Sequence, residues 1–210
     1  MEVARALPCV LQNRKNAMKK LFLSLGMACS LISAQAAVYV FDADLSGLTE
    51  SPPNASPGIG YALFHYDDTA NTLHVDVLFG RLMGTTTAAH IHAPTALPFT
   101  GTAGVATTVP NFAGFPTGVN VGSYETLLDL TSASSYNPAF ITANGGTTAG
   151  AQAALVAAMF AGRSYLNIHT TAFPGGEIRG FLTLVPEPSS FALLALGGAA
   201  LAAFRAKRRA

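Results

Sequence analysis

Tryptophan is absent from this 210-residue chain, cysteine occurs only twice, and charged residues make up only 11% of it. Both cysteines, Cys9 and Cys29, lie in the first 36 residues, which we expect to be removed. The remaining chain would then contain no disulfide and no thiol nucleophile. Residues 37–185 contain no lysine, and their nine acidic and three basic residues give a formal net charge of −6. Such a surface argues against nucleic-acid binding, which needs cations to neutralise phosphates.

The sequence also lacks the motifs of several enzyme classes. No serine lies in a Gly-x-Ser-x-Gly setting, and no glycine-rich phosphate loop precedes a helix. The adjacent carboxylates Asp67 and Asp68 fall in a predicted turn, where we expect them to be solvated; a weak calcium site is the alternative. These absences favour a protein that is not an enzyme.

The N-terminal segment has the three parts of a secretory signal peptide. A cationic start at Met18 precedes an apolar stretch over 21–32, and Ala34 and Ala36 form a small-x-small cleavage site. The seventeen residues before Met18 do not fit this pattern, so we expect Met18 to be the true start. Residues 1–36 are therefore predicted to be an upstream extension and a signal peptide. Lipidation of Cys29 is a less favoured alternative.

The C-terminal segment, residues 185–210, contains a second targeting pattern. A Pro-Glu-Pro turn precedes an apolar run over Phe191–Phe204, which is predicted to form a single hydrophobic helix. At about 14 residues this run is shorter than the roughly 20 that a stable membrane span needs. Basic residues follow it and favour a cytoplasmic C-terminus. The motif residues are Pro186, Glu187, Pro188, Arg205, Lys207, Arg208 and Arg209.

This order of turn, apolar helix and cationic end resembles the PEP-CTERM sorting signal of Gram-negative bacteria that make exopolysaccharide. The resemblance implies export through the secretion machinery and transient anchoring in the inner membrane. It also implies recognition by an exosortase and delivery to the cell surface or the medium. Exopolysaccharide or a matrix protein would then be the expected partner.

Between the two targeting segments, residues 37–184 are predicted to form one domain. Period-two alternation and turn residues predict many short strands, and an alanine-rich segment, Thr147–Ala161, predicts one short helix. We therefore expect an all-β fold, an antiparallel sandwich or barrel. The predicted strands are Val38–Leu45, Ile59–Tyr66, Leu73–Phe79, Ala88–Ala93, Gly104–Thr108, Tyr124–Leu130, Ser164–Ile168 and Ile178–Leu184.

Three histidines are the residues of this domain best suited to metal binding or to other chemistry. His90 and His92 are two apart in a predicted strand, so both imidazoles project from one face, and His169 ends another strand. The Pro174–Gly176 turn would bring His169 near Glu177, which opens the last strand. Together these four residues could hold zinc or copper. Alternatively, the histidines act as struts in a structural polar network, each bonded to a backbone carbonyl.

Geometry distinguishes these two hypotheses. A ligand set needs nitrogens that converge to roughly 4 Å of one another, because each ligand bond is about 2 Å. Struts would point at carbonyls instead. Glu177 could orient an imidazole or pair with Arg179, and we favour the ion pair.

Four sequence blocks resemble the CHRD domain, the module repeated in chordin and found singly in many bacterial exported proteins. They are Ala88–Pro94, Gly101–Gly104, Gly162–Thr170 and Phe173–Gly180. The resemblance implies an immunoglobulin-like or superoxide-dismutase-like fold and an extracellular setting, but no reaction. It departs from the usual pattern at Phe181, where the family has a polar residue.

The sequence therefore predicts an exported, non-catalytic CHRD-like domain that acts by binding or by structure. The alternative is a redox or hydrolytic enzyme that uses zinc or copper at the His-x-His strand. No catalytic residue is assigned, and no cofactor is expected unless the histidines bind metal.

Overall fold

The computed structural model describes residues 37–186, 196–199, 201, 204 and 207. The predicted signal peptide, with Met18, Ala34 and Ala36, lies outside these residues, as do Glu187, Pro188, Arg205, Arg208 and Arg209 of the sorting tail. The described residues beyond 195 are helical. Among all described residues, no helix is both long and apolar enough to cross a membrane.

The domain is mostly antiparallel β-structure, as the alternation predicts. The hairpin expected around Asp67–Asp68 forms, with β2 and β3 paired from Ile59↔Gly80 to Asp67↔Thr72. The strands are β1 (Val38–Ser46), β2 (Ile59–Asp67), β3 (Thr72–Gly80), β4 (Thr86–His92), β5 (Gly122–Asp129), β6 (Tyr165–Thr170), β7 (Ile178–Phe181) and β8 (Thr183–Leu184).

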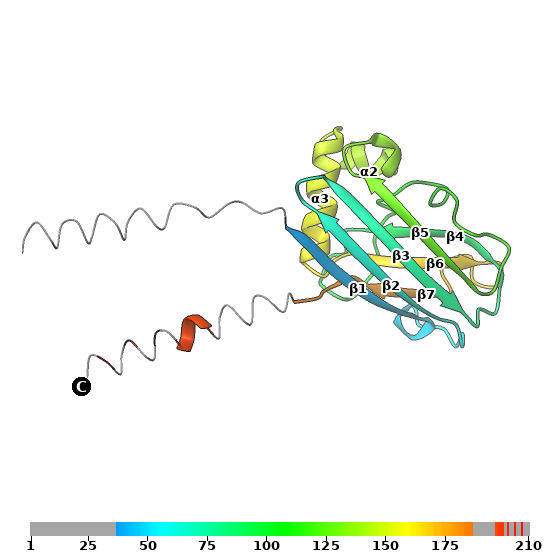
Figure 1. Ribbon diagram of the computed structural model, residues 1–210. Coiled ribbons are helices and arrows are strands. Elements are labelled where there is room, and N and C mark those ends of the chain that lie inside the picture. The colour runs from blue at the N-terminus through cyan, green and yellow to red at the C-terminus, as the bar shows by residue number, and fades with distance from the viewer. Residues whose placement is uncertain (1–36, 187–195, 200, 202–203, 205–206, 208–210) are drawn as a thin grey trace, which may run out of the picture. The chain divides into compact units, whose positions relative to one another are not determined.

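All eight strands belong to one sheet, with the order β4-β6-β7-β1-β2-β3-β5 and with β8 paired to β1. The sheet curls, so that β4, β6 and β7 pass behind the layer formed by β1, β2, β3 and β5 (Figure 1). Ile178 on β7 lies close to Gly60 on β2, because a Cβ added at Gly60 would be 3.3 Å from the Ile178 side chain. The two halves of the curl therefore face each other across the core.

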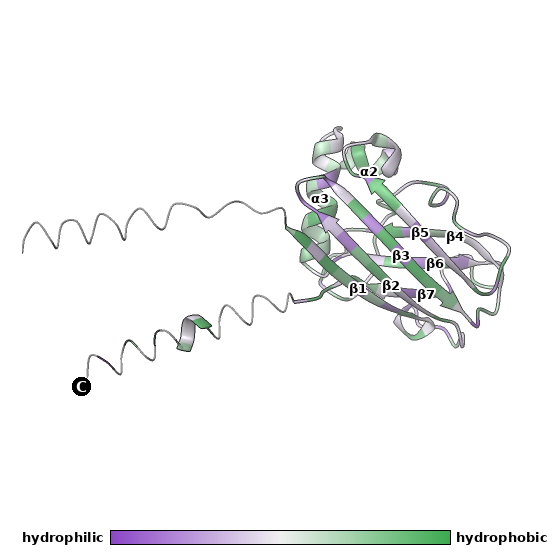
Figure 2. Ribbon diagram, viewed as in Figure 1, coloured by the Kyte–Doolittle hydropathy of each residue, from purple (hydrophilic) through white to green (hydrophobic). Residues whose placement is uncertain are grey.

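The core is one continuous cluster whose buried members run from Phe41 to Leu182. Alternate residues of each long strand point into it, which gives the alternating hydropathy bands along β2 and β3 in Figure 2. Phe64 and Val75, opposite each other on β2 and β3, are fully buried. Because the core formed by the described residues lies between 41 and 182, this domain has what it needs to fold on its own.

Within residues 37–186, two α-helices accompany the sheet, where the sequence predicted one. Helix α3 (Thr148–Phe160) forms where the alanine-rich segment predicts it, and the side chain of Thr147 caps it by accepting a bond from Gly150 N at 3.1 Å. Helix α2 (Pro138–Ala143) was not expected. Its six residues are too few to show the hydrophobic repeat of a helix, and the Asn137–Pro138 pair at its start is as typical of a turn as of a helix start. Short 3₁₀ turns occupy Gly47–Thr49 and Ala133–Ser135.

The strand predicted at Gly104–Thr108 was wrong. This segment makes only isolated bridges, from Val105 to His92 and from Thr107 to Tyr136. It belongs to the long connection between β4 and β5, where frequent Gly, Pro and Thr favour loops. That connection runs along the outer edge of β4, where Ala106 N and Phe112 N bond to backbone carbonyls of the strand, and its own carbonyls become part of the site described next.

Candidate functional site

The site lies on the outer face of β4 and β6. Ile91 on β4 and Leu166 on β6 are buried in the core, so the alternate residues face the other way. His90 and His92 project from the same face, as predicted, and His169 on β6 projects beside them. We call these three residues the three-histidine cluster. Their ring centroids lie 5.4 to 5.9 Å apart.

Each histidine of the cluster is held by one backbone carbonyl. His90 Nε2 bonds to Pro110 O at 2.6 Å, and His92 Nδ1 bonds to Ala103 O at 2.9 Å. His169 Nδ1 bonds to Pro174 O at 2.9 Å. Because a carbonyl oxygen only accepts, the bonded nitrogen of each ring must carry the hydrogen. This fixes the neutral tautomer of all three rings.

The opposite nitrogen of each ring then presents a lone pair. These atoms are His90 Nδ1, His92 Nε2 and His169 Nε2, all buried and all without a hydrogen-bond partner in the part of the chain that the structure describes. One nitrogen from each of the three residues lies within 4.8 Å of the others. The two hypotheses drawn from the sequence are therefore compatible, because each ring bonds a carbonyl on one side and faces its neighbours on the other.

Burial keeps these rings neutral at ordinary pH. Burial, together with the nearby His169, His90 and Arg179, lowers the pKa of His92 from 6.5 to about 4 in spite of the bond to Ala103. Burial also lowers the pKa of His90 and of His169. A neutral imidazole is the form that binds metal ions.

Tyr165 on β6 reinforces the position of His92. The two rings stack with centroids 4.8 Å apart and planes 7° from parallel. The hydroxyl of Tyr165 accepts a bond from Ala103 N at 3.2 Å, while Ala103 O accepts the bond from His92. One loop residue thus fixes both rings. The period-two spacing of Tyr165 and His169 on one strand is a sequence signal that could have identified this contribution.

Glu177 does not share the centre of the three-histidine cluster. Its carboxylate is fully buried and accepts four hydrogen bonds, from Ser56 Oγ at 2.5 Å, Met83 N at 2.6 Å, Thr170 Oγ1 at 2.6 Å and Gly84 N at 3.1 Å. Burial alone would raise the pKa of Glu177, but these four donors lower it overall. Glu177 therefore ties three segments of the chain together.

The expected ion pair between Glu177 and Arg179 was wrong. In the described part of the chain, Arg179 pairs with Glu50, with Nε and Oε2 3.7 Å apart and both side chains buried. Burial raises the pKa of Glu50 to about 7, although the charge of Arg179 acts to lower it. Arg179 also lies over the Tyr165 ring at 4.7 Å. Sequence reasoning missed Glu50 because it lies in a loop about 130 residues away.

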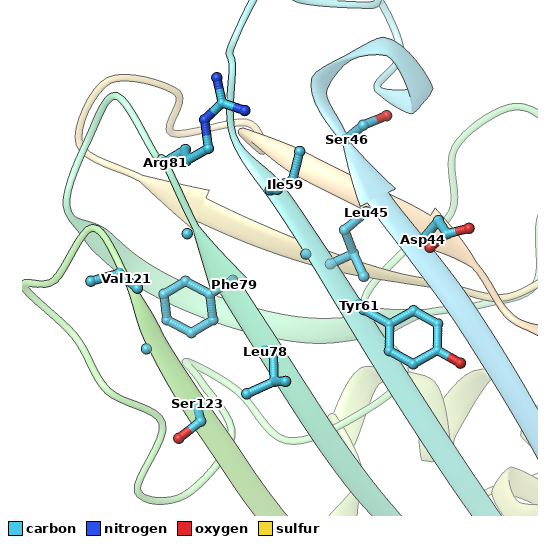
Figure 3. A pocket seen from close by; sticks show the side chains of 13 residues that line it. Asp44, Leu45, Ser46, Ile59, Tyr61, Leu78, Phe79, Arg81, Val121 and Ser123 are labelled. Atoms are coloured by element: carbon cyan, nitrogen blue, oxygen red, sulfur yellow. The ribbon is translucent and has the colours of Figure 1, made fainter.

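A second feature is an open depression of about 1010 Å³ on the outer face of β1, β2, β3 and β5. Figure 3 shows its exposed side chains, among them Tyr61, Leu78 and Val121, with Asp44 and Arg81 at its border. The sequence did not single out this surface. The loops at 94–99 and 109–119 are compatible, from their sequence, with a binding rim or with packing on the core, and packing is the favoured interpretation; Phe112 and Phe115 are indeed core residues.

Comparisons with known proteins agree with both resemblances. The family model of the CHRD domain matches residues 41–182, and that of the PEP-CTERM protein-sorting motif matches residues 184–209. No curated protein and no solved structure matches the chain. Neither family is catalytic, and the sorting motif implies recognition by an exosortase, export and sorting in the cell envelope. The chain belongs to the CHRD-domain family and carries a C-terminal PEP-CTERM sorting motif.

Proposed function

We propose that this protein is a non-catalytic component of the cell surface or exopolysaccharide matrix of a Gram-negative bacterium. A signal peptide ending at Ala36 exports it, and the tail anchors it in the inner membrane until an exosortase processes it. The observation that carries this proposal is the position of the sorting motif. It starts at residue 184, directly where β8 (Thr183–Leu184) ends. One folded domain is thus the cargo that the tail delivers.

The depression on the outer sheet face supports a binding role for this cargo. Exposed Tyr61, Leu78 and Val121 form an apolar surface bordered by a few polar groups, the usual composition of a ligand site. The net charge of −6 on residues 37–185 opposes binding to an anionic polymer. The ligand that suits this face is a neutral polysaccharide, whose C–H surfaces pack on aromatic and aliphatic side chains.

Fractionation tests the sorting part of the proposal. The protein is expressed in an exosortase-containing host and in the same host with the exosortase gene deleted. We expect a shortened form at the surface or in the medium of the first, and a full-length form in the inner membrane of the second. The triple variant Pro186→Ala/Glu187→Ala/Pro188→Ala should stay in the membrane in both hosts, whereas Glu125→Ala should behave like the parent protein in each host. Identical distribution in the two hosts would contradict the proposal.

Co-sedimentation with purified matrix polysaccharide tests the binding part. Leu78→Ala, which alters the depression, should reduce the bound fraction, whereas Leu127→Ala should leave it unchanged. Leu127 is the matched control, since it is equally exposed but lies outside the depression. Equal binding by both variants would exclude this face.

The three-histidine cluster supports a second candidate, a metal-dependent redox or hydrolytic enzyme. What favours it is the convergence of three unprotonated, buried nitrogens. Assays for superoxide dismutation and ester hydrolysis with the metal-loaded protein test it. Turnover that disappears in His92→Gln would support an enzyme, and no turnover above free metal would exclude it.

A further inference from the structure

We propose that the three-histidine cluster binds one late first-row transition-metal ion, Cu²⁺ more tightly than Zn²⁺, with at least one coordination position open. The ligand atoms are His90 Nδ1, His92 Nε2 and His169 Nε2. This inference concerns the domain alone and is independent of where the tail delivers it.

The first argument is the hydrogen-bonding chemistry of the centre. Three rings with fixed tautomers direct three acceptor lone pairs toward one region, and none of these nitrogens has a donor in the described part of the chain. Buried acceptors are normally paired, because leaving them unpaired is costly. A water molecule could donate to only two of the three. A single cation satisfies all three at once.

The second argument is distance. Metal–nitrogen bonds of about 2.0 Å place three imidazole nitrogens about 3.3 to 3.5 Å apart around one ion. Here one nitrogen of each of the three residues lies within 4.8 Å of the others, so each is at most about 0.8 Å further from a common centre than a bound ligand would be. A rotation of each ring about its bond to the carbonyl would close that gap.

The third argument is the surroundings of the ligands. A metal-binding histidine usually donates its other N–H to a carbonyl or carboxylate, which fixes the ring and increases its basicity. All three rings have this arrangement, to Pro110, Ala103 and Pro174. His92 is further held by stacking on Tyr165. These contacts position the ligands before any ion arrives, which reduces the entropy lost on binding.

The ligand type selects the metal. An all-imidazole set suits copper and zinc, whereas calcium and magnesium require oxygen ligands. Divalent affinities at a nitrogen site rise to Cu²⁺ and fall again at Zn²⁺. Three protein ligands leave a fourth position for water or another small ligand. Because His169 is only half-buried, this side of the cluster is the one nearest to solvent.

The test is a titration of the full chain, purified in detergent through a tag that contains no histidine and stripped of metal beforehand. CuSO₄ and ZnSO₄ are the probes. We expect one equivalent of Cu²⁺ to bind, with an electron paramagnetic resonance spectrum coupled to three nitrogens. Zn²⁺ should bind more weakly and be displaced by copper. Either ion should raise the melting temperature.

Matched variants locate the site. His169→Ala should lose at least about 100-fold in copper affinity and lose the three-nitrogen spectrum. The double variant His65→Ala/His74→Ala, which removes the other two histidines, should bind copper as the parent does. If His169→Ala is poorly folded, His90→Gln replaces it, with circular dichroism as the check. The proposal is overturned if the folded parent binds no stoichiometric metal. It is also overturned if binding survives in the folded cluster variants or depends on His65 and His74.

Discussion

The substitution Glu177→Gln tests how much one buried carboxylate stabilises the domain. Each carboxylate oxygen of Glu177 accepts one hydroxyl and one backbone N–H: Oε1 from Ser56 and Met83, Oε2 from Thr170 and Gly84. A glutamine amide must direct its NH₂ group at one of these pairs. The hydroxyl can turn away, but the backbone N–H cannot. Either orientation of the amide therefore leaves one buried N–H opposite another donor.

The magnitude follows from these contacts. An unsatisfied buried N–H costs about 1–3 kcal/mol, and the remaining bonds lose about 1 kcal/mol each when the acceptor is no longer charged. Removing the buried charge recovers part of its desolvation cost. Because the pKa of Glu177 is lowered, the hydrogen bonds outweigh that cost. We expect a net loss of about 3 kcal/mol in unfolding free energy at pH 7, or roughly 10 °C in melting temperature.

Urea unfolding of residues 37–186 measures this loss. The matched control is Glu125→Gln, the same chemical change at a side chain that is 73% exposed and that pairs with His74. We expect the control to change stability by about 0.5 kcal/mol or less. The difference between Glu177→Gln and the parent should also narrow below pH 4.5, because a lowered pKa stabilises the fold only where the carboxylate is ionised. A loss below about 1 kcal/mol at pH 7 would refute the reasoning.

Three further predictions concern the turn, the core and the histidines. Gly176 has φ 132°, and a Cβ there would come within 2.5 Å of a side-chain amide, so Gly176→Ala should destabilise the domain by about 2 kcal/mol or more by thermal unfolding. Gly175→Ala, where a Cβ meets no atom within 4 Å, should be nearly neutral. Ile168→Ala should remove about 2–5 kcal/mol in urea, because Ile168 is fully buried. The pKa of His92 is lowered from 6.5 to about 4 in the folded protein, so the unfolded chain takes up a proton at His92 before the folded chain does. The unfolding free energy should therefore be unaffected by His92 above pH 6.5 and should fall by up to about 3 kcal/mol as the pH is lowered to 4. The variant His92→Gln should lack this part of the pH dependence. Glu50, whose raised pKa makes the fold more stable as the pH falls, contributes equally to the parent and to the variant. Parallel curves of unfolding free energy for parent and variant from pH 7 to 4 would contradict the lowered pKa of His92.

The sequence was sufficient to predict that His90 and His92 project from the same face of their strand. Period two places His90 and His92 together, and the Pro174–Gly176 turn returns the chain so that β6 and β7 pair at Ile168↔Ile178. It was also sufficient for the start of helix α3, because a threonine cap has a simple local cause. These features depend on neighbours a few residues apart.

The rest of the site depends on contacts between distant segments. The carbonyls that fix the ring tautomers come from Ala103 and Pro110 in the long β4–β5 connection, whose path no local pattern specifies. For this reason the sequence left struts and ligands as alternatives, although the same rings can be both. The partner of Arg179 was likewise decided by packing, which places Glu50 beside it. Glu177 was already occupied by donors from three other segments.

A crystal structure of the copper-soaked domain, with anomalous diffraction recorded at the copper absorption edge, tests the central claim most directly. The account predicts one strong anomalous peak about 2.0 Å from His90 Nδ1, His92 Nε2 and His169 Nε2, with the bonds to Pro110, Ala103 and Pro174 retained. A fully occupied copper site elsewhere, with the three nitrogens bonded to water or to other protein groups, would contradict it.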